Sequence, residues 1–317
     1  MTHVWVLADD RAGNVNQLLG IADVLGEPYE RKDIRYTKWV RLPNWLRGSS
    51  CVGITPESQQ NLCEPWPDVV LSAGRRSFPV ARYIQKKSRG QTKVVQLMNP
   101  GAWGFKKADL IVLPAHDKYN GRADNVSVVT GAPHRVTVDR LTSERQHWKE
   151  ILGGYPSKRV ALIVGGATKD KPFTIDMARD LIKGVKALQP GSVLVTTSRR
   201  TPNDVVALLK QELPEPTFFY QYGDAGENPY FGLLAYADEI VVTGDSISMC
   251  SECCAAGVPV FIFAPEQMMG SKHKRFHATL YREGYAVPLG AHRVEPKGSL
   301  NAAFTIAERI RELLVSG

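Results

Sequence analysis

Short apolar runs rich in β-branched residues alternate with amphipathic stretches along the chain. Runs of this kind, separated by segments with helical periodicity, predict parallel strands connected by helices. The runs form two series, at residues 3–8, 69–72, 93–98, 109–113 and 126–129, and then at 159–164, 192–197, 217–220, 239–243, 258–263 and 286–289. The pattern therefore predicts an α/β protein with two parallel-sheet domains.

The predicted boundary lies in "TGAPHRVTVD", residues 130–139, where glycine and proline interrupt the pattern. A polar helix is expected directly after it, at 140–152. We therefore expect domains at 1–136 and 137–317. A chain of 317 residues with 43% hydrophobic content is long enough to bury two cores.

The composition limits the location and the partners of the protein. No apolar run approaches the roughly 18–20 residues that span a bilayer, so a cytoplasmic protein is expected. The net charge of +8 favours an anionic partner, which could be a nucleotide phosphate, an acidic membrane surface or a nucleic acid. The basic residues are scattered, which favours a folded cleft or a membrane-facing surface over a disordered arm. A basic surface that serves only solubility is the alternative.

The five cysteines do not form a disulfide or zinc pattern. Cys250, Cys253 and Cys254 crowd one segment, whereas Cys51 and Cys63 are not spaced as a metal-binding pair. We expect reduced thiols that act as small buried hydrophobes, and no metal site. The basic stretch "GSKHKRFHATL", residues 270–280, either approaches a phosphate or a membrane or is a solvated loop and helix start.

The first strand leads into "ADDRAGNVNQLLGIADVLGEP", residues 8–28. Helical spacing of its leucines predicts a helix that ends at Gly26, and residues 9–16 are expected to be the loop before that helix. Gly13 permits a tight turn there, and Asp10 is placed to accept a proton. The alternative is that Asp9 or Asp10 only caps the turn. The loop lacks GxGxxG and GxxxxGK[ST], so neither a dinucleotide fingerprint nor a P-loop is predicted.

Polar residues follow three other strands of the first series. In "LSAGRRSFPVARYI", Gly74 ends the strand, Arg75 and Arg76 follow it, and Ser77 is expected to cap a helix that begins near Phe78. Two guanidiniums at a strand end suit an anionic or polyhydroxylated ligand, although a solvated surface pair is the alternative. The other strand-end residues are Asn99 in "LMNPG" and His116 in "LPAHD", and a histidine in such a position is more often structural.

The second series has its own strand-end loops. One strand ends in Gly165-Gly166, with Lys169 in the following loop, and the next ends in "TTSRRTP". Thr201 as N-cap with Pro202 at the first helical position predicts a helix start that places Ser198, Arg199 and Arg200 between strand and helix. Helix N–H groups and two arginines in one loop predict a diphosphate site.

The stretch "EIVVTGDSISMCSECCAAGVPVFIF", residues 239–263, contains a buried strand, a turn at Gly244 and a helix that begins at Asp245 or Ser246. The turn from Ser246 through Ser248 to Met249 offers N–H groups to a phosphate. On the expected solvent side of the helix, Glu252 is placed to accept hydrogen bonds from a ribose diol.

This arrangement resembles the GT-B nucleotide-sugar glycosyltransferases, and most closely the bacterial members of the family named after a plant mitochondrial-fission protein. The resemblance rests on motifs that follow one another along nearly the whole chain: "ADDRAGNVNQ", "LSAGRR", "LMNPG", "LPAHD", "TGAPHRVT", "TTSRRTP" and "TGDSISMCSE". It implies two facing Rossmann-like domains, with a last helix at about 302–315 packed near the domain junction.

The resemblance also implies that the two domains bind different substrates. The acceptor site would lie in the first domain and use Gly13, Asn14, Arg75, Arg76, Asn99 and His116. The donor site would lie in the second domain and use Gly165, Gly166, Lys169, Ser198, Arg199, Arg200, Thr201, Asp245, Ser246, Ser248, Met249 and Glu252. A histidine is often available as the base in the first loop of GT-B enzymes, but this loop offers Asp10 and Asn14. The expected reaction is a metal-independent, inverting glycosyl transfer to a cell-envelope saccharide or lipid-linked acceptor, with Asp10 as base and Arg199 and Arg200 stabilising the leaving group.

Three alternatives stay open at this stage. The chain could be a non-catalytic nucleotide-binding scaffold, a glycosyltransferase that modifies nucleic acid, or a nucleotide-sugar epimerase or hydrolase. No cofactor is expected beyond the nucleotide sugar as co-substrate. The expected location is the cytoplasm, with peripheral contact to an anionic inner membrane as a variant.

Overall fold

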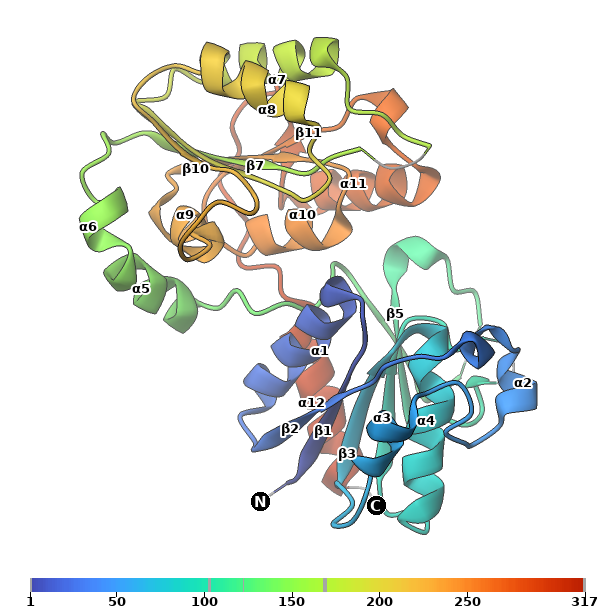
Figure 1. Cartoon of the computed structure of the whole chain (residues 1–317). Helices are drawn as coiled ribbons and strands as arrows, with labels where there is room; N and C mark the ends of the chain where they lie inside the picture. Colours follow the sequence, from blue (N-terminus) through green and yellow to red (C-terminus); the bar gives the residue numbers. More distant parts are fainter. Residues whose placement is uncertain (1, 102–103, 122, 168–169, 316–317) are drawn as a thin grey trace. The chain divides into compact units, whose positions relative to one another are not determined.

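The computed structural model describes residues 2–101, 104–121, 123–167 and 170–315. Contacts divide the chain into two units, one comprising the residues up to Arg135 together with the segment from Asn301 onward, and the other Val136–Leu300. Each unit is a six-stranded parallel sheet with helices on both faces (Figure 1). No helix in the described residues is both long enough and apolar enough to cross a membrane.

The amino-terminal unit alternates strands with helices. Its elements are β1 (Val4–Ala8), α1 (Ala12–Leu25), β2 (Tyr29–Asp33), η1 (Lys38–Arg41), α2 (Asn44–Arg47), α3 (Pro56–Gln60), β3 (Val69–Ala73), α4 (Gly74–Lys87), β4 (Lys93–Leu97), β5 (Leu110–Pro114), η3 (Ala115–Asp117), β6 (Val126–Val129) and, from the end of the chain, α12 (Ala302–Val315).

The strands of this unit lie in the order β2-β1-β3-β4-β5-β6. Alternation along β1 sends Val4 and Val6 to a core shared with α1 and α12, and Trp5 and Leu7 to a core shared with α4. Both faces of the sheet are therefore buried, which explains the continuous apolar runs in the sequence.

The helix α12 is part of the first core. Ala303, Ile306 and Ile310 are fully buried beside Leu18 and Ile21 of α1. The Asn301 side chain bonds the carbonyl of His134 at 3.0 Å, which ties the start of α12 to the end of the unit's first segment. The chain thus returns to its amino-terminal unit after completing the other one.

The carboxy-terminal unit repeats the same architecture. Its elements are α5 (Val138–His147), α6 (Lys149–Leu152), β7 (Arg159–Val164), α7 (Ile175–Ala187), β8 (Ser192–Thr197), α8 (Asn203–Glu212), β9 (Thr217–Tyr220), α9 (Tyr230–Tyr236), β10 (Glu239–Thr243), α10 (Ile247–Cys253), β11 (Val260–Phe263), η4 (Glu266–Met268), α11 (Ser271–Glu283) and β12 (Val287–Pro288).

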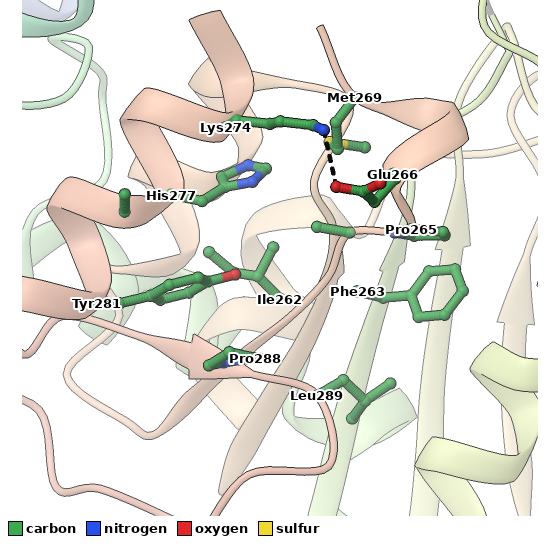
Figure 2. Close-up of a pocket in the computed structure, with 12 residues that line it drawn as sticks. Ile262, Phe263, Pro265, Glu266, Met269, Lys274, His277, Tyr281, Pro288 and Leu289 are labelled. Atoms are coloured by element: carbon green, nitrogen blue, oxygen red, sulfur yellow. Dashed lines mark hydrogen bonds and ion pairs between the residues drawn. The ribbon is translucent and has the colours of Figure 1, made fainter. Parts of the chain in front are cut away.

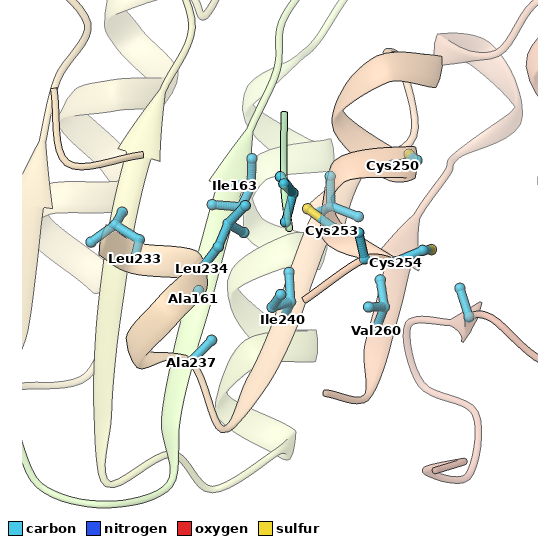
Figure 3. Packing of buried hydrophobic residues seen from close by; sticks show 14 of the residues in the cluster. Ala161, Ile163, Leu233, Leu234, Ala237, Ile240, Cys250, Cys253, Cys254 and Val260 are labelled. Carbon is cyan, nitrogen blue, oxygen red and sulfur yellow. The ribbon is translucent and has the colours of Figure 1, made fainter. Parts of the chain in front are cut away.

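Its strands lie in the order β12-β11-β10-β7-β8-β9, with α7 and α8 packed on one face of the sheet. The helices α9, α10 and α11 pack on the other face, and Figure 3 shows side chains of α9 and α10 in this core. The thiols of Cys250, Cys253 and Cys254 lie within that core, and burial raises their pKa values, the last to about 12. These cysteines therefore pack as small apolar side chains.

The predicted α/β class with two parallel sheets is confirmed. Every strand expected from the sequence is present, with ends that differ by at most two residues. The strand β2, however, was not predicted. Its sequence YERKD is polar because it lies at the sheet edge, where four of its five residues are exposed.

Candidate functional sites

Both sheets carry polar residues at the point where the strand order reverses. In the carboxy-terminal sheet β7 lies between β8 and β10, which corresponds to the dinucleotide-fold order 3-2-1-4-5-6. In the amino-terminal sheet β1 lies between β2 and β3. Connections leave such a strand and its neighbour in opposite directions, so a crevice opens beyond their carboxyl ends and ligands bind there.

Asp245 holds together the three loops at the switch point of the carboxy-terminal sheet. Its carboxylate is buried, with only 4% of the side chain exposed. It accepts hydrogen bonds from the Gly166 N–H at 3.0 Å and from the Thr243 hydroxyl at 2.7 Å. It also pairs with the Arg200 guanidinium at 3.0 Å. One carboxylate thus connects the ends of β7, β8 and β10.

Gly165 and Gly166 are required by this packing. A Cβ added at Gly165 would lie 2.1 Å from a carboxylate oxygen of Asp245, and one at Gly166 would lie 2.1 Å from the Arg200 carbonyl oxygen. The Gly165 N–H donates a hydrogen bond to the Thr243 hydroxyl, and the Gly166 N–H donates one to the Asp245 carboxylate. The glycines therefore allow close packing of the loops. Their contact with the donor, which the family resemblance implies, stays a prediction.

The loop after β8 differs from its predicted geometry. The helix α8 begins at Asn203 with Pro202 as its flanking residue, so the prediction of Thr201 as N-cap is wrong. The Thr201 hydroxyl instead accepts from the Ser198 N–H at 2.9 Å and donates to the Gly165 carbonyl. A hydroxyl that bonds two loops is unavailable to the helix. Lys169 lies outside the described residues.

The cations of this loop are accessible. Arg200 keeps 39% of its side chain exposed while it pairs with Asp245, and Arg199 is exposed. The Ser198 hydroxyl accepts from the Arg200 N–H at 3.2 Å, which shapes the turn. The result is a guanidinium whose position is set by a buried carboxylate and whose outer face is open to an anion.

Glu252 does not lie on the solvent side of its helix, as the sequence had suggested. It is half-buried and accepts a 2.5 Å hydrogen bond from the Tyr230 hydroxyl of α9. Burial raises the pKa of Glu252 to about 7, although the hydrogen bond from Tyr230 opposes the rise. The carboxyl is therefore poised between its neutral and ionised forms near neutral pH.

The start of α10 matches its prediction. Ser246 caps the helix by accepting from the Met249 N–H at 3.4 Å. Ser248 is half-buried, and Met249 packs on the core beneath. The Met249 N–H is therefore occupied by the cap.

Two histidines of α11, His273 and His277, lie near the carboxyl end of β10. A Cβ at Gly244 would be 2.5 Å from the ring of His277, so the glycine makes room for that imidazole. Burial lowers the pKa of His277 to about 4 and also lowers that of His273. Within the described residues, His277 Nε2 has no hydrogen-bond partner. Both rings are therefore neutral at pH 7.

His277 borders a hollow of about 450 Å³ beside β11 and α11. Figure 2 shows its ring between Lys274 and Tyr281 on the helix, opposite Phe263 and Pro265. The Lys274 ammonium pairs with Glu266 at 2.9 Å across the mouth. The spacing of His273 and His277, four residues apart, places both on one helix face. That spacing was the available sequence signal for this pair.

At the switch point of the amino-terminal sheet, Arg76 pairs with two carboxylates. Its guanidinium contacts Asp9 at 2.9 Å, makes a shorter contact to Asp10 and stacks 4.5 Å from the ring centre of Tyr36. The side chain of Asp9 is only 4% exposed, whereas that of Asp10 is 68% exposed. The hydrogen bond from Arg76 lowers the pKa of Asp10.

Asp9, Asp10 and Tyr36 line a hollow of about 530 Å³. The positive charge expected of the Arg75–Arg76 pair is therefore largely neutralised at Arg76. Arg75 is exposed and donates to the Leu42 carbonyl at 3.0 Å. Tyr36 was missed by the sequence reasoning, because only the folded connection after β2 brings it to Arg76.

Two helix starts of this unit lie earlier than predicted. The helix α1 begins at Ala12, so Gly13 and Asn14 are in its first turn and not in a loop. The helix α4 begins at Gly74, whose φ of +74° allows an abrupt strand-to-helix turn. Ser77 lies inside α4 and donates to the Ala73 carbonyl at 2.8 Å, so it is not the predicted cap.

The remaining predicted acceptor residues follow β4 and β5. Asn99 is exposed and its side chain accepts from the Gly101 N–H at 2.7 Å. His116 is buried in the turn η3. In the described parts of the chain, no three or more histidine, cysteine, aspartate or glutamate residues are grouped as metal ligands.

The comparisons with known proteins decide the family. The sequence model of the family described as "Mitochondrial fission ELM1" matches residues 12–314. The chain belongs to this family.

Two curated proteins are similar to this chain in sequence. The uncharacterized protein RP120 of Rickettsia prowazekii is 30% identical, over 90% of this chain and 89% of its own length. The mitochondrial fission protein ELM1 of Arabidopsis thaliana is 27% identical over 66% of this chain, and the match spans 54% of the plant protein.

Solved structures of similar shape identify the fold. The UDP-GlcNAc 2-epimerase of Methanocaldococcus jannaschii aligns over 99% of this chain and all of its own, with a TM-score of 0.55 and 13% identity. A glycotransferase of kitacinnamycin aligns over 99% and 94%, with a TM-score of 0.51 and 15% identity. This ELM1-family chain therefore has a GT-B-like fold, as expected from the sequence.

Replacement of Gly166 by alanine tests whether the switch-point loops are closely packed. The new methyl group would meet the Arg200 backbone, so we expect the free energy of unfolding to fall by about 1–3 kcal/mol. Gly13→Ala is the control, because a Cβ there has no atom within 4 Å and alanine favours the helix. Thermal unfolding of both variants measures the difference, and equal stability would contradict this packing.

A second prediction concerns Glu252. A carboxyl whose pKa rises from 4.5 to about 7 on folding loses stability as pH increases through that range, because the unfolded chain ionises first. Relative to Glu252→Gln, the wild-type protein should therefore lose up to about 3 kcal/mol between pH 4.5 and pH 8. Glu150→Gln, at an exposed position, controls for general effects. A pH-independent difference for Glu252→Gln would show that this carboxyl is not buried as described.

Proposed function

We propose that this protein is a nucleotide-sugar-dependent glycosyltransferase whose carboxy-terminal unit binds the donor. One observation carries the proposal: Arg200 is held by the buried Asp245 at the switch point of a parallel sheet, with its outer face exposed. A guanidinium fixed in this way is prepared to bind a diphosphate without loss of side-chain entropy on binding. Arg199 in the same loop adds a second cation.

Glu252 supplies the complementary polar group for the nucleoside. Its carboxyl lies on α10, the helix that follows the strand and turn containing Asp245. Both Asp245 and Glu252 lie close enough to the Cys250 thiol to raise its pKa, after the larger effect of burial. An ionised Glu252 accepts two hydroxyl donors, which suits a ribose diol.

One of the solved structures with a similar fold contains a nucleotide sugar. The Neisseria meningitidis UDP-GlcNAc 2-epimerase, with a TM-score of 0.53 to this chain, was solved bound to UDP-GlcNAc. At 13% identity this likeness supports only the fold. The nucleotide sugar is therefore proposed for this chain because the fold and the charged switch point agree.

The proposed reaction is metal-independent and inverting. An acceptor hydroxyl oxygen forms a bond to the anomeric carbon, the bond from that carbon to the diphosphate oxygen breaks, and the diphosphate leaves with the electron pair. Arg199 and Arg200 stabilise the charge on the leaving group. Gly13, Asn14, Arg75, Asn99 and His116 remain the proposed acceptor contacts, and the acceptor is proposed to be a cell-envelope saccharide or a lipid-linked saccharide.

Asp10 is the proposed base, and its ion pair with Arg76 lowers its basicity. Asp9 is buried against Arg76, whereas Asp10 is exposed and is the carboxylate of this group that can contact a ligand. Its lowered pKa makes it a weak base. We propose that the hydroxyl proton is transferred late, when the forming bond has made that proton acidic.

The epimerases among the similar structures make nucleotide-sugar epimerisation the second candidate. An epimerase or hydrolase changes the donor without an acceptor, whereas a transferase consumes the donor only when the acceptor is present. A scaffold changes neither. Donor consumption with and without acceptor, followed by chromatography, separates these functions.

A binding experiment tests the donor site. We expect one nucleoside diphosphate among UDP, GDP, ADP and TDP to stabilise the protein, by about 2.7 kcal/mol at 100 times its dissociation constant. Arg200→Gln should weaken that binding by at least about 10-fold. Arg179→Gln, an exposed arginine of α7, should leave it unchanged. Failure of every nucleotide to bind would contradict the proposed donor site.

A kinetic experiment tests the base. Asp10→Asn should lower kcat by about 10²-fold or more and leave donor binding unchanged, because the base acts on the acceptor hydroxyl. Asp33→Asn is the matched control, since Asp33 lines the same hollow and pairs with Arg31. Full activity of Asp10→Asn would remove Asp10 from this role.

A further inference from the structure

An unusual surface lies in the connection between β2 and α3. Residues 35–54, called here the 35–54 connection, contain the turn η1 and the short helix α2. Four of its large apolar side chains are strongly exposed: Trp39 by 56%, Trp45 by 65%, Leu46 by 55% and Val52 by 47%. Exposed tryptophan and leucine side chains clustered in one connection mark an interaction surface.

The connection is a folded structure and not a loose loop. The buried Arg47 donates to the Val52 carbonyl at 2.9 Å and to the Arg76 carbonyl at 3.1 Å. Asn44 donates to the carbonyls of Arg75 and Pro100. These bonds fix α2 to the start of α4, and Figure 1 shows α2 on the outside of the amino-terminal unit.

The two ends of the connection also lie together. Thr37 N–H bonds the Gly53 carbonyl at 3.0 Å, and a Cβ at Gly53 would lie 2.9 Å from the Val40 backbone. This pairing brings the chain next to Trp39 close to the chain next to Val52. The apolar side chains are thus presented at the surface by a hydrogen-bonded support.

The charge of the connection is entirely positive. Between Asp33 and Glu57 there is no acidic residue, and Arg35, Lys38 and Arg41 are exposed. The exposed Arg75 joins them by its hydrogen bond to Leu42. Cations and tryptophans in one surface match an anionic bilayer, where lipid headgroups attract the cations and indole rings favour the interface.

We propose that the 35–54 connection docks the protein on an anionic lipid bilayer. Trp39, Trp45, Leu46 and Val52 enter the headgroup region, and Lys38 and Arg41 bind lipid phosphates. A single-stranded nucleic acid would also suit cations with tryptophans, but the aliphatic Leu46 and Val52 offer no face for base stacking. They suit acyl chains, and this favours the membrane.

Vesicle flotation of the full chain tests the proposal. We expect binding to phosphatidylcholine vesicles that contain 30% phosphatidylglycerol, and at least about 10-fold weaker binding to phosphatidylcholine alone. Lys38→Gln with Arg41→Gln should reduce the binding about 25-fold, because each cation contributes about fivefold. Trp45→Ser with Leu46→Ser should reduce it by at least about 10-fold.

Matched variants of the carboxy-terminal unit serve as controls. Lys183→Gln with Lys186→Gln removes two exposed cations of α7, and Val138→Ser with Ile151→Ser removes two exposed apolar side chains. Both pairs should bind vesicles within about twofold of the wild type. All substituted side chains are exposed, so thermal unfolding should stay close to that of the wild type, and this check separates lost docking from lost folding.

Four outcomes would overturn the proposal. The wild-type protein could fail to bind the anionic vesicles, or the control pairs could lose as much binding as the 35–54 variants. The connection could instead bind a labelled oligothymidine through Trp45 without binding vesicles, which would identify a nucleic-acid surface. Light scattering could also show a dimer that Trp45→Ser dissociates and no vesicle binding, which would identify a second copy of the chain as the partner.

Discussion

The buried carboxylate of Asp245 is the constraint on which the carboxy-terminal site depends. A charge taken out of water is costly unless it is paired and hydrogen-bonded, and Asp245 is compensated by Arg200, Thr243 and the Gly166 N–H. These partners come from the ends of three strands. The hydrogen bonds and ion pair that compensate this buried carboxylate therefore fix the relative positions of the loops. The two glycines after β7 provide the space that this arrangement requires.

The amino-terminal unit uses a related device at its own switch point. Buried Asp9 after β1 holds Arg76 after β3, as Asp245 holds Arg200. The two sites differ in what remains accessible. In the carboxy-terminal unit the arginine faces solvent, which suits an anionic ligand, whereas in the amino-terminal unit the exposed group is the carboxylate of Asp10. The difference agrees with a donor diphosphate in one unit and a hydroxyl acceptor in the other.

The sequence predicts those features that depend on local pattern. Buried strands read as apolar runs, and the glycine after α1 marks its end with a φ of +71°. The polar edge strand β2 has no such pattern and was missed. Two helix starts were misplaced because a hydroxyl residue near the start was taken for the N-cap. The Thr201 and Ser77 hydroxyls instead form other hydrogen bonds: Thr201 accepts from the Ser198 N–H, and Ser77 donates to the Ala73 carbonyl.

The candidate sites were predicted only in part, because local sequence pattern does not show which distant residues meet. The sequence indicated which residues follow the strands, but the pairs Tyr230–Glu252 and Arg200–Asp245 join residues 22 and 45 positions apart. Such pairs follow from the folded arrangement of strands and helices. The hydrogen-bonded support beneath Trp39 and Trp45 likewise depends on bonds to α4, which no local pattern reveals.

The central claim is that Asp245 positions Arg200 to receive the diphosphate of a nucleotide. A crystal structure of the protein grown with the nucleoside diphosphate that stabilises it would test this claim most directly. The account predicts phosphate oxygens within hydrogen-bonding distance of the Arg200 guanidinium, the Asp245–Arg200 pair intact, and a ribose hydroxyl at Glu252. A nucleotide bound elsewhere, with Arg200 contacting only Asp245, would contradict it.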